Sequence, residues 1–138
     1  MSLTKQKGNI AEAKVLTYLI SQGFGVFVPW GEDNRYDLVC DIFGTLQRIQ
    51  VKYVSPKNNC IEIPLRSCNN WNNIKYNKES VDIIAAYNPS DDKIYFIKLS
   101  DFKNTATVKL RFGNTKNCQK QFVRWAKDFE NLKAFGPM

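Results

Sequence analysis

The residues of this chain best suited to chemistry lie in two short apolar runs separated by one turn. Asp37 stands at the head of the first run, Gln50 and Lys52 stand in the second, and Gly44-Thr45 separates the two. A carboxylate and a side-chain amide oxygen are hard ligands of the kind that Mg²⁺ prefers. An ammonium group beside such a metal could orient a water molecule or neutralise charge on a phosphate under attack.

Residues 35–52 are predicted to form a β-hairpin, because runs rich in Val, Ile and Leu flank Gly44-Thr45. Glycine in the first position of a two-residue loop favours a type II′ turn. The register set by this loop pairs Phe43 with Leu46, Asp41 with Arg48, Val39 with Gln50, and Asp37 with Lys52. The acid, the amide and the amine would therefore lie within reach of one point.

Alternation along the two predicted strands separates a core face from a polar face. The core face is predicted to carry Leu38, Cys40, Ile42, Ile49 and Val51. The polar face is predicted to carry Asp37, Val39, Asp41, Arg48, Gln50 and Lys52, with the backbone carbonyl of Val51 as a further oxygen between the last two. Such a concentration of polar groups is costly to desolvate, which indicates a functional site. The alternative is a surface hairpin with an Asp37–Lys52 ion pair of little energetic value.

At these residues the chain resembles the PD-(D/E)XK nuclease superfamily, whose motif is an Asp at the start of one strand and (D/E)-X-K on the next. Asp37 matches the first acid, and residues 50–52 match the second half with Gln in place of the acid. The QXK form and the string NRYDLV at residues 34–39 resemble the group I intron homing endonucleases of PD-(D/E)XK type. Archaeal Holliday junction resolvases are a more distant resemblance.

The resemblance implies an α/β fold with a restriction-endonuclease-like core, in which elements follow as α-β-β-β-α-β and helices flank a mixed sheet. It implies a Mg²⁺ site, in which Mn²⁺ could substitute, made by Asp37, Gln50, Val51 and Glu12. The implied catalytic residues are Glu12, Asp37, Gln50 and Lys52, with Lys52 orienting the attacking water. Glu12 is the only acid of a helix predicted over residues 4–22 and closed by Gly23. Its alternative role is an exposed ion pair with a nearby Lys.

The remaining elements follow from alternation and β-propensity. Strands are predicted at residues 24–28, 60–65, 81–87, 94–99 and 107–112, with 81–87 completing the sheet beside the Lys52 strand. Residues 67–80 are predicted to be a loop with a short helical turn. Between residues 52 and 81 no second core helix is evident, which departs from the resembled pattern. Apolar residues at helical spacing predict a basic C-terminal helix from residue 114 to about 132.

The chain has 138 residues and a formal net charge of +7, which fits one domain with a polyanionic partner. Residues 102–138 are predicted to be a basic extension, because they hold eight Lys and Arg against two acids. The candidate contacts to double-stranded DNA are Arg35, Lys116, Lys120, Arg124 and Lys127. A solvated helix face is the alternative interpretation of the last four.

Several classes of site are excluded or disfavoured by composition. The chain has no His, and its four Cys show no CxxC spacing, which disfavours a His-based triad and a structural zinc site. Reduced thiols and the absence of eighteen consecutive apolar residues favour a cytoplasmic protein without membrane insertion.

A site-specific, double-strand DNA endonuclease of the homing type is the function that the residues and the resemblance favour together. A junction resolvase or a restriction-type nuclease of the same fold is the first alternative, and a non-cleaving DNA-binding module is an alternative of another class. One small domain cuts one strand, so breaking both strands predicts a homo-oligomer, either a dimer or a tetramer.

Overall fold

The structure is a computed structural model that describes residues 2–31, 34–68, 73–75, 81–113, 123–130 and 132. It begins with the helix α1, Leu3–Ser21, which confirms the predicted first helix. Ser2 caps this helix, because its side-chain oxygen accepts a hydrogen bond from the Lys5 N–H at 3.2 Å. Among the described residues, no helix has both the length and the apolar character needed to cross a membrane.

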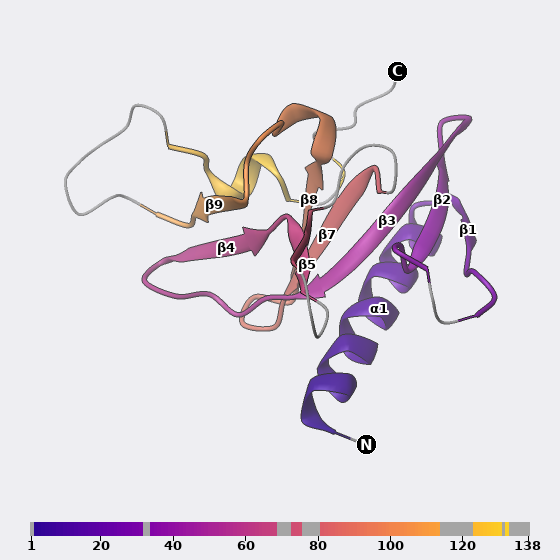
Figure 1. Cartoon of the computed structure of the whole chain (residues 1–138), viewed down its shortest axis with the longest axis horizontal. Helices are drawn as coiled ribbons and strands as arrows, with labels where there is room; N and C mark the ends of the chain where they lie inside the picture. The colour runs from indigo at the N-terminus through magenta and orange to yellow at the C-terminus, as the bar shows by residue number, and fades with distance from the viewer. Residues whose placement is uncertain are drawn as a thin grey trace.

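A mixed five-stranded sheet forms the centre of the molecule (Figure 1). Its strands, in spatial order, are β1 (Gly25–Phe27), β2 (Leu38–Ile42), β3 (Thr45–Tyr53), β7 (Ile83–Asn88) and β8 (Lys93–Lys98). The β3–β7 pair is parallel and the other three pairs are antiparallel. The predicted α/β mixed sheet is therefore confirmed, including the placement of residues 81–87 beside the Lys52 strand.

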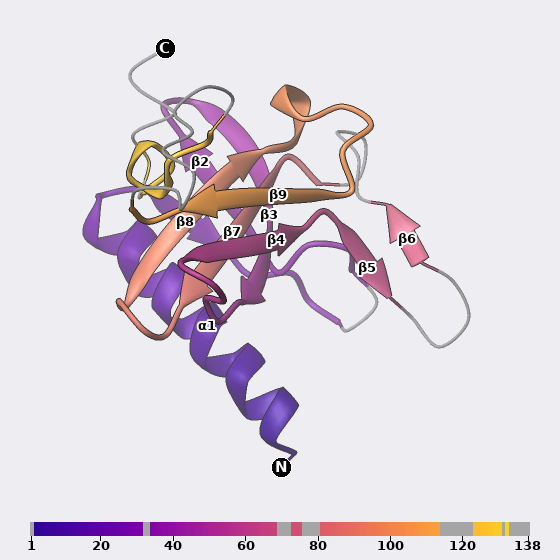
Figure 2. The ribbon, with the colours of Figure 1, turned by 90° about the vertical axis from the view of Figure 1, so that its left-hand side faces the viewer.

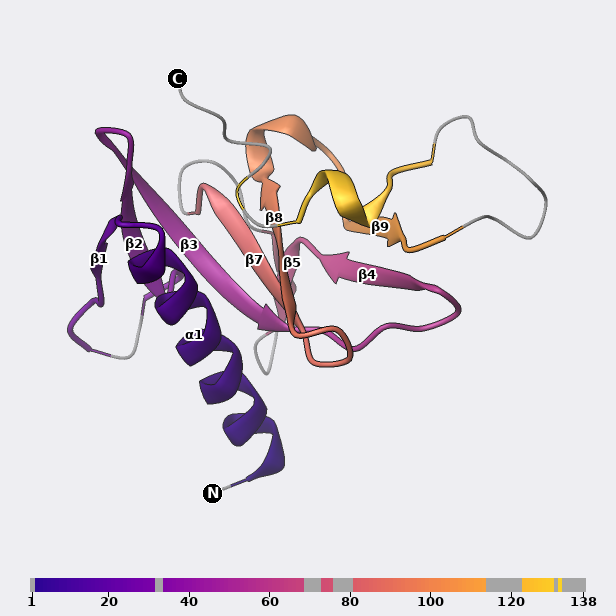
Figure 3. The same cartoon turned by 180° about the vertical axis from the view of Figure 1, so that it is seen from behind.

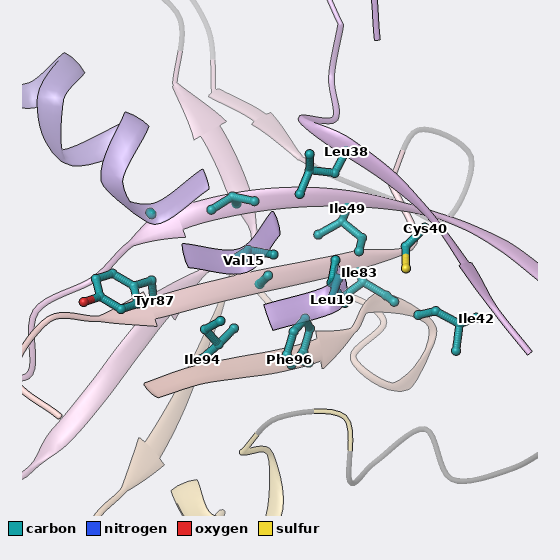
Figure 4. Close-up of a cluster of buried hydrophobic side chains, with 13 residues drawn as sticks. Val15, Leu19, Leu38, Cys40, Ile42, Ile49, Ile83, Tyr87, Ile94 and Phe96 are labelled. Atoms are coloured by element: carbon teal, nitrogen blue, oxygen red, sulfur yellow. The ribbon is translucent and has the colours of Figure 1, made fainter. Parts of the chain in front are cut away.

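Helix α1 covers one face of this sheet and forms a buried core with it (Figure 4). Ala11, Val15 and Leu19 recur at four-residue spacing and are fully buried against the strands. The strands contribute the five side chains assigned to the core face by alternation, which are Leu38, Cys40, Ile42, Ile49 and Val51. The predicted division of the hairpin into a core face and a polar face is thus confirmed.

The opposite face of β7 and β8 is covered by strands, where the resemblance implied a second core helix. β4 (Cys60–Pro64) and β9 (Thr107–Arg111) form an antiparallel pair that lies across β7 and β8 (Figure 2). Its apolar side chains make a second core with Ile84 and Tyr95. Figure 3 shows α1 and this pair on opposite sides of the sheet. Helices therefore do not flank both faces in the described part of the chain.

Two further segments differ from their predictions. β5 (Arg66–Cys68) and β6 (Asn73–Lys75) pair with each other, although residues 67–80 were predicted to be a loop with a helical turn. Short 3₁₀ turns occur at η1 (Leu99–Asp101) and η2 (Ala126–Asp128). The second of these replaces the predicted C-terminal helix over residues 123–130, and residues 114–122 lie outside the described ranges.

The backbone of the C-terminal segment is engaged with neighbouring strands, which explains the absence of the helix there. The Arg124 carbonyl accepts from the Arg111 N–H at 2.9 Å, and the Phe129 carbonyl accepts from the Phe96 N–H at 3.0 Å. These bonds extend the edges of β9 and β8. The carbonyls that an α-helix would use internally are therefore occupied by sheet-like bonds.

The predicted β2–β3 hairpin is wrong in its turn, which lies one residue earlier, and in its register, in which each partner is shifted by two residues. The loop is Phe43-Gly44, and both residues have positive φ, 52° and 90°, as a type I′ turn requires. Asp41 stabilises it, because its Oδ1 accepts from the Gly44 N–H at 2.9 Å. Val39 therefore pairs with Arg48, and Asp41 pairs with Leu46. A shift of two residues preserves alternation, so each side chain keeps its predicted face.

Candidate active site

Asp37 is held at the start of β2 by two bonds to β3. Its N–H donates to the Ile49 carbonyl at 2.8 Å, and its Oδ2 accepts from the Val51 N–H at 2.8 Å. The corrected register thus brings Asp37 toward Gln50 and Val51, where a direct pair with Lys52 was predicted. Because Oδ2 is used by the backbone, Oδ1 is the oxygen best suited to ligate a metal.

The ionisation of Asp37 reflects a balance between burial and its neighbours. Burial raises the pKa of Asp37 above its ordinary value, while the Val51 N–H and the Lys52 ammonium act in the opposite direction. Lys52 is half-buried near the C-terminal end of β3. The predicted acid and amine are therefore close enough to interact electrostatically.

Glu12 joins this pair from α1. It follows the buried Ala11 on the helix and is itself half-buried. Burial raises the pKa of Glu12, and the negative charge of Asp37 raises it further. Asp37, directly before β2, therefore interacts electrostatically with Glu12 of α1 and with Lys52 of β3. Gln50 is half-buried on the same face of β3 as Lys52.

The donor set at this point fits a hard divalent cation. Burial raises the pKa of both carboxylates, and the charge of Asp37 further opposes the ionisation of Glu12, so a cation between them would favour the ionised forms. Within the described ranges, no group of three or more His, Cys, Asp and Glu side chains is close enough to hold a metal. The Gln50 amide and the Val51 carbonyl would have to supply the remaining protein oxygens, which are neutral ligands suited to Mg²⁺.

An ion pair beside Gln50 was missed by the sequence analysis. Arg48 donates through its backbone N–H and Nε to Asp82 Oδ2 at 2.8 and 3.1 Å, and through Nη2 to Oδ1 at 3.3 Å. The hydrogen bonds to Asp82 raise the pKa of Arg48. This fork ties β3 to the residue before β7 and stiffens the polar face. No local signal could have found it, because the partners are 34 positions apart.

Three of the five predicted DNA contacts lie among the described residues, in two separate segments of the chain. Arg35 is exposed two positions before Asp37. The Arg124 guanidinium stacks over the Phe102 ring at 5.1 Å, and Lys127 is exposed on η2. Lys116 and Lys120 fall among residues that the structure does not describe. Their roles in binding DNA stay predictions.

Comparisons with known proteins identify the family and the fold of the chain. A search of curated protein sequences found no match to the chain. Among solved structures, a bacterial homing endonuclease, I-Ssp6803I, superposes with a TM-score of 0.74. The match covers 99% of this chain and 94% of that chain at 24% sequence identity, and it supports the fold. The family model described as PD-(D/E)XK endonuclease matches residues 2–132, and on that match the chain belongs to this endonuclease family.

Proposed function

We propose that the protein is a divalent-metal-dependent endonuclease that hydrolyses phosphodiester bonds of double-stranded DNA. The observation that carries this proposal is that Asp37, which accepts a hydrogen bond from the Val51 N–H, interacts electrostatically with both Glu12 and Lys52. Membership of the endonuclease family supplies the reaction class. The net charge of +7 suits a polyanionic substrate.

Each group at the site has a definite role in this proposal. Glu12, Asp37, Gln50 and the Val51 carbonyl would hold Mg²⁺ or Mn²⁺. A bound divalent ion would act as a Lewis acid on the phosphate and lower the pKa of a water molecule. Lys52 would hold the attacking water and offset the negative charge that builds on the phosphate oxygens. The Val51 N–H fixes the orientation of Asp37, so this carboxylate is positioned before substrate arrives.

The test is cleavage of supercoiled plasmid by the wild type, Asp37→Asn and Glu62→Gln, with Mg²⁺, with Mn²⁺ and without metal. Asp37→Asn keeps the size of the side chain and removes its charge. Glu62 on β4 is a matched control, because its carboxylate is exposed and pairs only loosely with Lys109, at 3.8 Å. We expect metal-dependent cleavage by the wild type and Glu62→Gln, and none by Asp37→Asn. DNA retention without cleavage in either metal would refute the proposal.

We infer that the cleavage is site-specific, as expected for a homing-type enzyme. The similarity in fold to a bacterial homing endonuclease supports this inference. Sequencing of the ends produced from mixed-sequence DNA is the direct measurement, and a single long site is the expected result. Preferential cutting of four-way junctions over linear duplex would instead indicate a resolvase. Activity of either kind would take place inside the cell, a setting that suits the free thiols of Cys40 and Cys60.

We also infer that copies of the chain assemble through one surface, which we call the apolar edge. It consists of five exposed apolar side chains on β1, just after it, and at the β2–β3 turn, namely Phe27, Val28, Trp30, Phe43 and Leu46. Residues 15–31 contain no charged side chain. Two copies that each carry +7 repel one another, so an uncharged surface is where they can meet. Two active sites in one assembly would cut both strands.

A further inference from the structure

A hollow of about 500 Å³ lies between the N-terminal part of α1 and the C-terminal end of β3. We call it the β3 hollow, and the residues that matter here are Thr4, Lys7, Gly8, Lys52, Tyr53 and Ser55. Lys52 belongs both to this hollow and to the candidate active site. The two features therefore adjoin, and a ligand in one lies next to a ligand in the other.

The polar groups of the β3 hollow favour an anion. Lys7 and Lys52 contribute ammonium groups, while Thr4 and Ser55 contribute hydroxyls that can donate hydrogen bonds. No carboxylate is present among the described residues that line it. A negatively charged group entering the hollow would thus meet donors and positive charge without repulsion from its lining.

Lys7 is held in place although it is exposed. Its Nζ lies over the Tyr53 ring, 5.6 Å from the centroid, and Tyr53 in turn makes an edge contact with Tyr87 at 5.9 Å between centroids. A cation held over an aromatic face has lost part of its rotational freedom before it binds a ligand. Lys7 is therefore better prepared to bind an anion than a lysine that extends freely into solvent.

The position of Gly8 on α1 shows that the hollow lies close to the carboxylate of Glu12. Gly8 and Glu12 are four residues apart on α1, so they occupy the same side of the helix about one turn, or 5.4 Å, from each other. A Cβ added at Gly8 would meet no atom within 4 Å. The space in front of this residue is thus open and lies one helical turn from the proposed metal site.

We propose that the β3 hollow binds a backbone phosphate of DNA adjacent to the one that is cut, with Lys7 as a positioning residue. The proposal rests on the proposed function, since it assumes that the scissile phosphate lies at Glu12, Asp37 and Lys52. Thr4 and Ser55 donate hydrogen bonds to the phosphate oxygens, and Lys7 supplies charge. Holding this phosphate in place determines which phosphate of the same DNA strand lies in front of Lys52.

The test measures binding of a short labelled duplex of mixed sequence in EDTA, over a series of salt concentrations. Lys7→Gln should lower affinity about three- to ten-fold and reduce the slope of log K against log salt by about one. Lys5→Gln is the matched control, because Lys5 lies on the same part of α1, is exposed and does not line the hollow. It removes the same charge and should change the slope far less.

A second variant separates loss of the site from loss of the fold. Gly8→Leu should fill the hollow and lower DNA affinity, while raising the melting temperature because Gly is a poor helix former. Misfolding would lower both quantities. Equal affinities and slopes for Lys7→Gln and Lys5→Gln would overturn the proposal, as would wild-type affinity in Gly8→Leu or the absence of measurable duplex binding.

Plasmid cleavage by the same preparations distinguishes this proposal from the proposed function. If the wild type cuts DNA and Lys7→Gln behaves as Lys5→Gln does, the assignment of the hollow fails and the endonuclease proposal stands. If binding depends on Lys7 and Gly8 but no preparation cuts DNA, the proposed function fails and the hollow remains a phosphate site.

Discussion

The β3 hollow and the apolar edge belong to the same sheet, but they differ in the groups they present. The hollow combines two ammonium groups with hydroxyls and adjoins two carboxylates. The apolar edge exposes aromatic and aliphatic side chains, with Trp30 fully exposed, beside a stretch without any charge. Phosphates require charge and donors, whereas a second copy of a basic protein requires a surface without charge. The difference is the reason for proposing that DNA binds at the first surface and that copies assemble through the second.

The largest effect is expected on the cleavage rate, from a substitution of Lys52 in the β3 hollow. Lys52→Met keeps the aliphatic stem and removes the ammonium, so the cleavage rate should fall by on the order of 10²- to 10⁴-fold. Lys57→Met is the control, because Lys57 is exposed in the turn that follows β3. Single-turnover cleavage at saturating DNA is the measurement. If Lys52→Met cleaves DNA at a rate within a few-fold of the control, Lys52 has no role in catalysis.

The next largest effect is expected at the apolar edge. Val28→Glu buries a charge if copies meet there, and should raise the dissociation constant of the assembly by on the order of tenfold or more. Leu3→Glu is a matched control, since Leu3 and Val28 are both 66% exposed. Sedimentation velocity over a range of concentrations measures the change. Plasmid cleavage by Val28→Glu should shift from double-strand breaks to single nicks.

The same mass distribution for Val28→Glu and Leu3→Glu would contradict assembly through this edge. The apolar edge would then be a candidate DNA-binding surface, because Trp30 and its neighbours would be available for apolar contacts to DNA. Loss of duplex binding by Val28→Glu, without any change in mass, would identify that case.

A smaller effect is expected from restoring an acid to the second half of the motif. Gln50→Glu adds a negative ligand, so Mg²⁺ affinity should rise by roughly tenfold. Gln22→Glu at the C-terminal cap of α1 adds the same charge at an exposed position and should leave Mg²⁺ affinity unchanged. Isothermal titration with Mg²⁺ measures both. Unchanged affinity in Gln50→Glu would show that residue 50 is not a ligand.

The smallest effect concerns pH and the stability of the metal-free protein. The raised pKa of Glu12 means that the folded state holds this proton more tightly than the unfolded state does. Ionisation of Glu12 therefore costs stability as pH rises above its ordinary value of 4.5 and through the raised pKa. Glu12→Gln should raise the melting temperature at neutral pH, by on the order of a few degrees, and change it little below pH 4.5.

Divalent metal provides the complementary measurement for Glu12. Mg²⁺ should raise the melting temperature of the wild type at neutral pH, because it offsets repulsion between Glu12 and Asp37. Glu12→Gln should lose most of this rise, and Glu62→Gln should keep it. An equal Mg²⁺ response in all three proteins would place the cation elsewhere.

The sequence predicted the hairpin faces better than the hairpin geometry, and the reason is physical. Alternation with period two survives a shift of two residues, so the core face was right although the register was wrong. The turn depends on Phe43 adopting a positive φ, which an aromatic residue rarely does. A Gly44-Thr45 loop was the reasonable choice from local preferences alone. Only the Asp41 side chain gave a local signal for the observed turn.

The features that could not be predicted depend on contacts between distant residues. β4 and β9 meet across more than forty positions to form the layer that stands where the second helix was expected. Arg48 and Asp82 are 34 positions apart. In the C-terminal segment, the apolar pattern fitted a helix, but bonds to β8 and β9 determined the backbone. The secondary-structure propensity of a segment depends on its own residues, so it carries no information on these contacts with distant residues.

The continuity of α1 has a consequence for how this enzyme can change over evolution. One helix carries the buried Val15 and Leu19, the acid Glu12, and part of the lining of the β3 hollow. If the proposed metal and phosphate sites are correct, a substitution that shifts this helix would alter folding, metal binding and phosphate contact together. Variants with new DNA sequence preferences but intact cutting should therefore accumulate their changes outside α1 and β3. In that case the helix would limit sequence change near the proposed active site more than on surfaces that recognise DNA elsewhere.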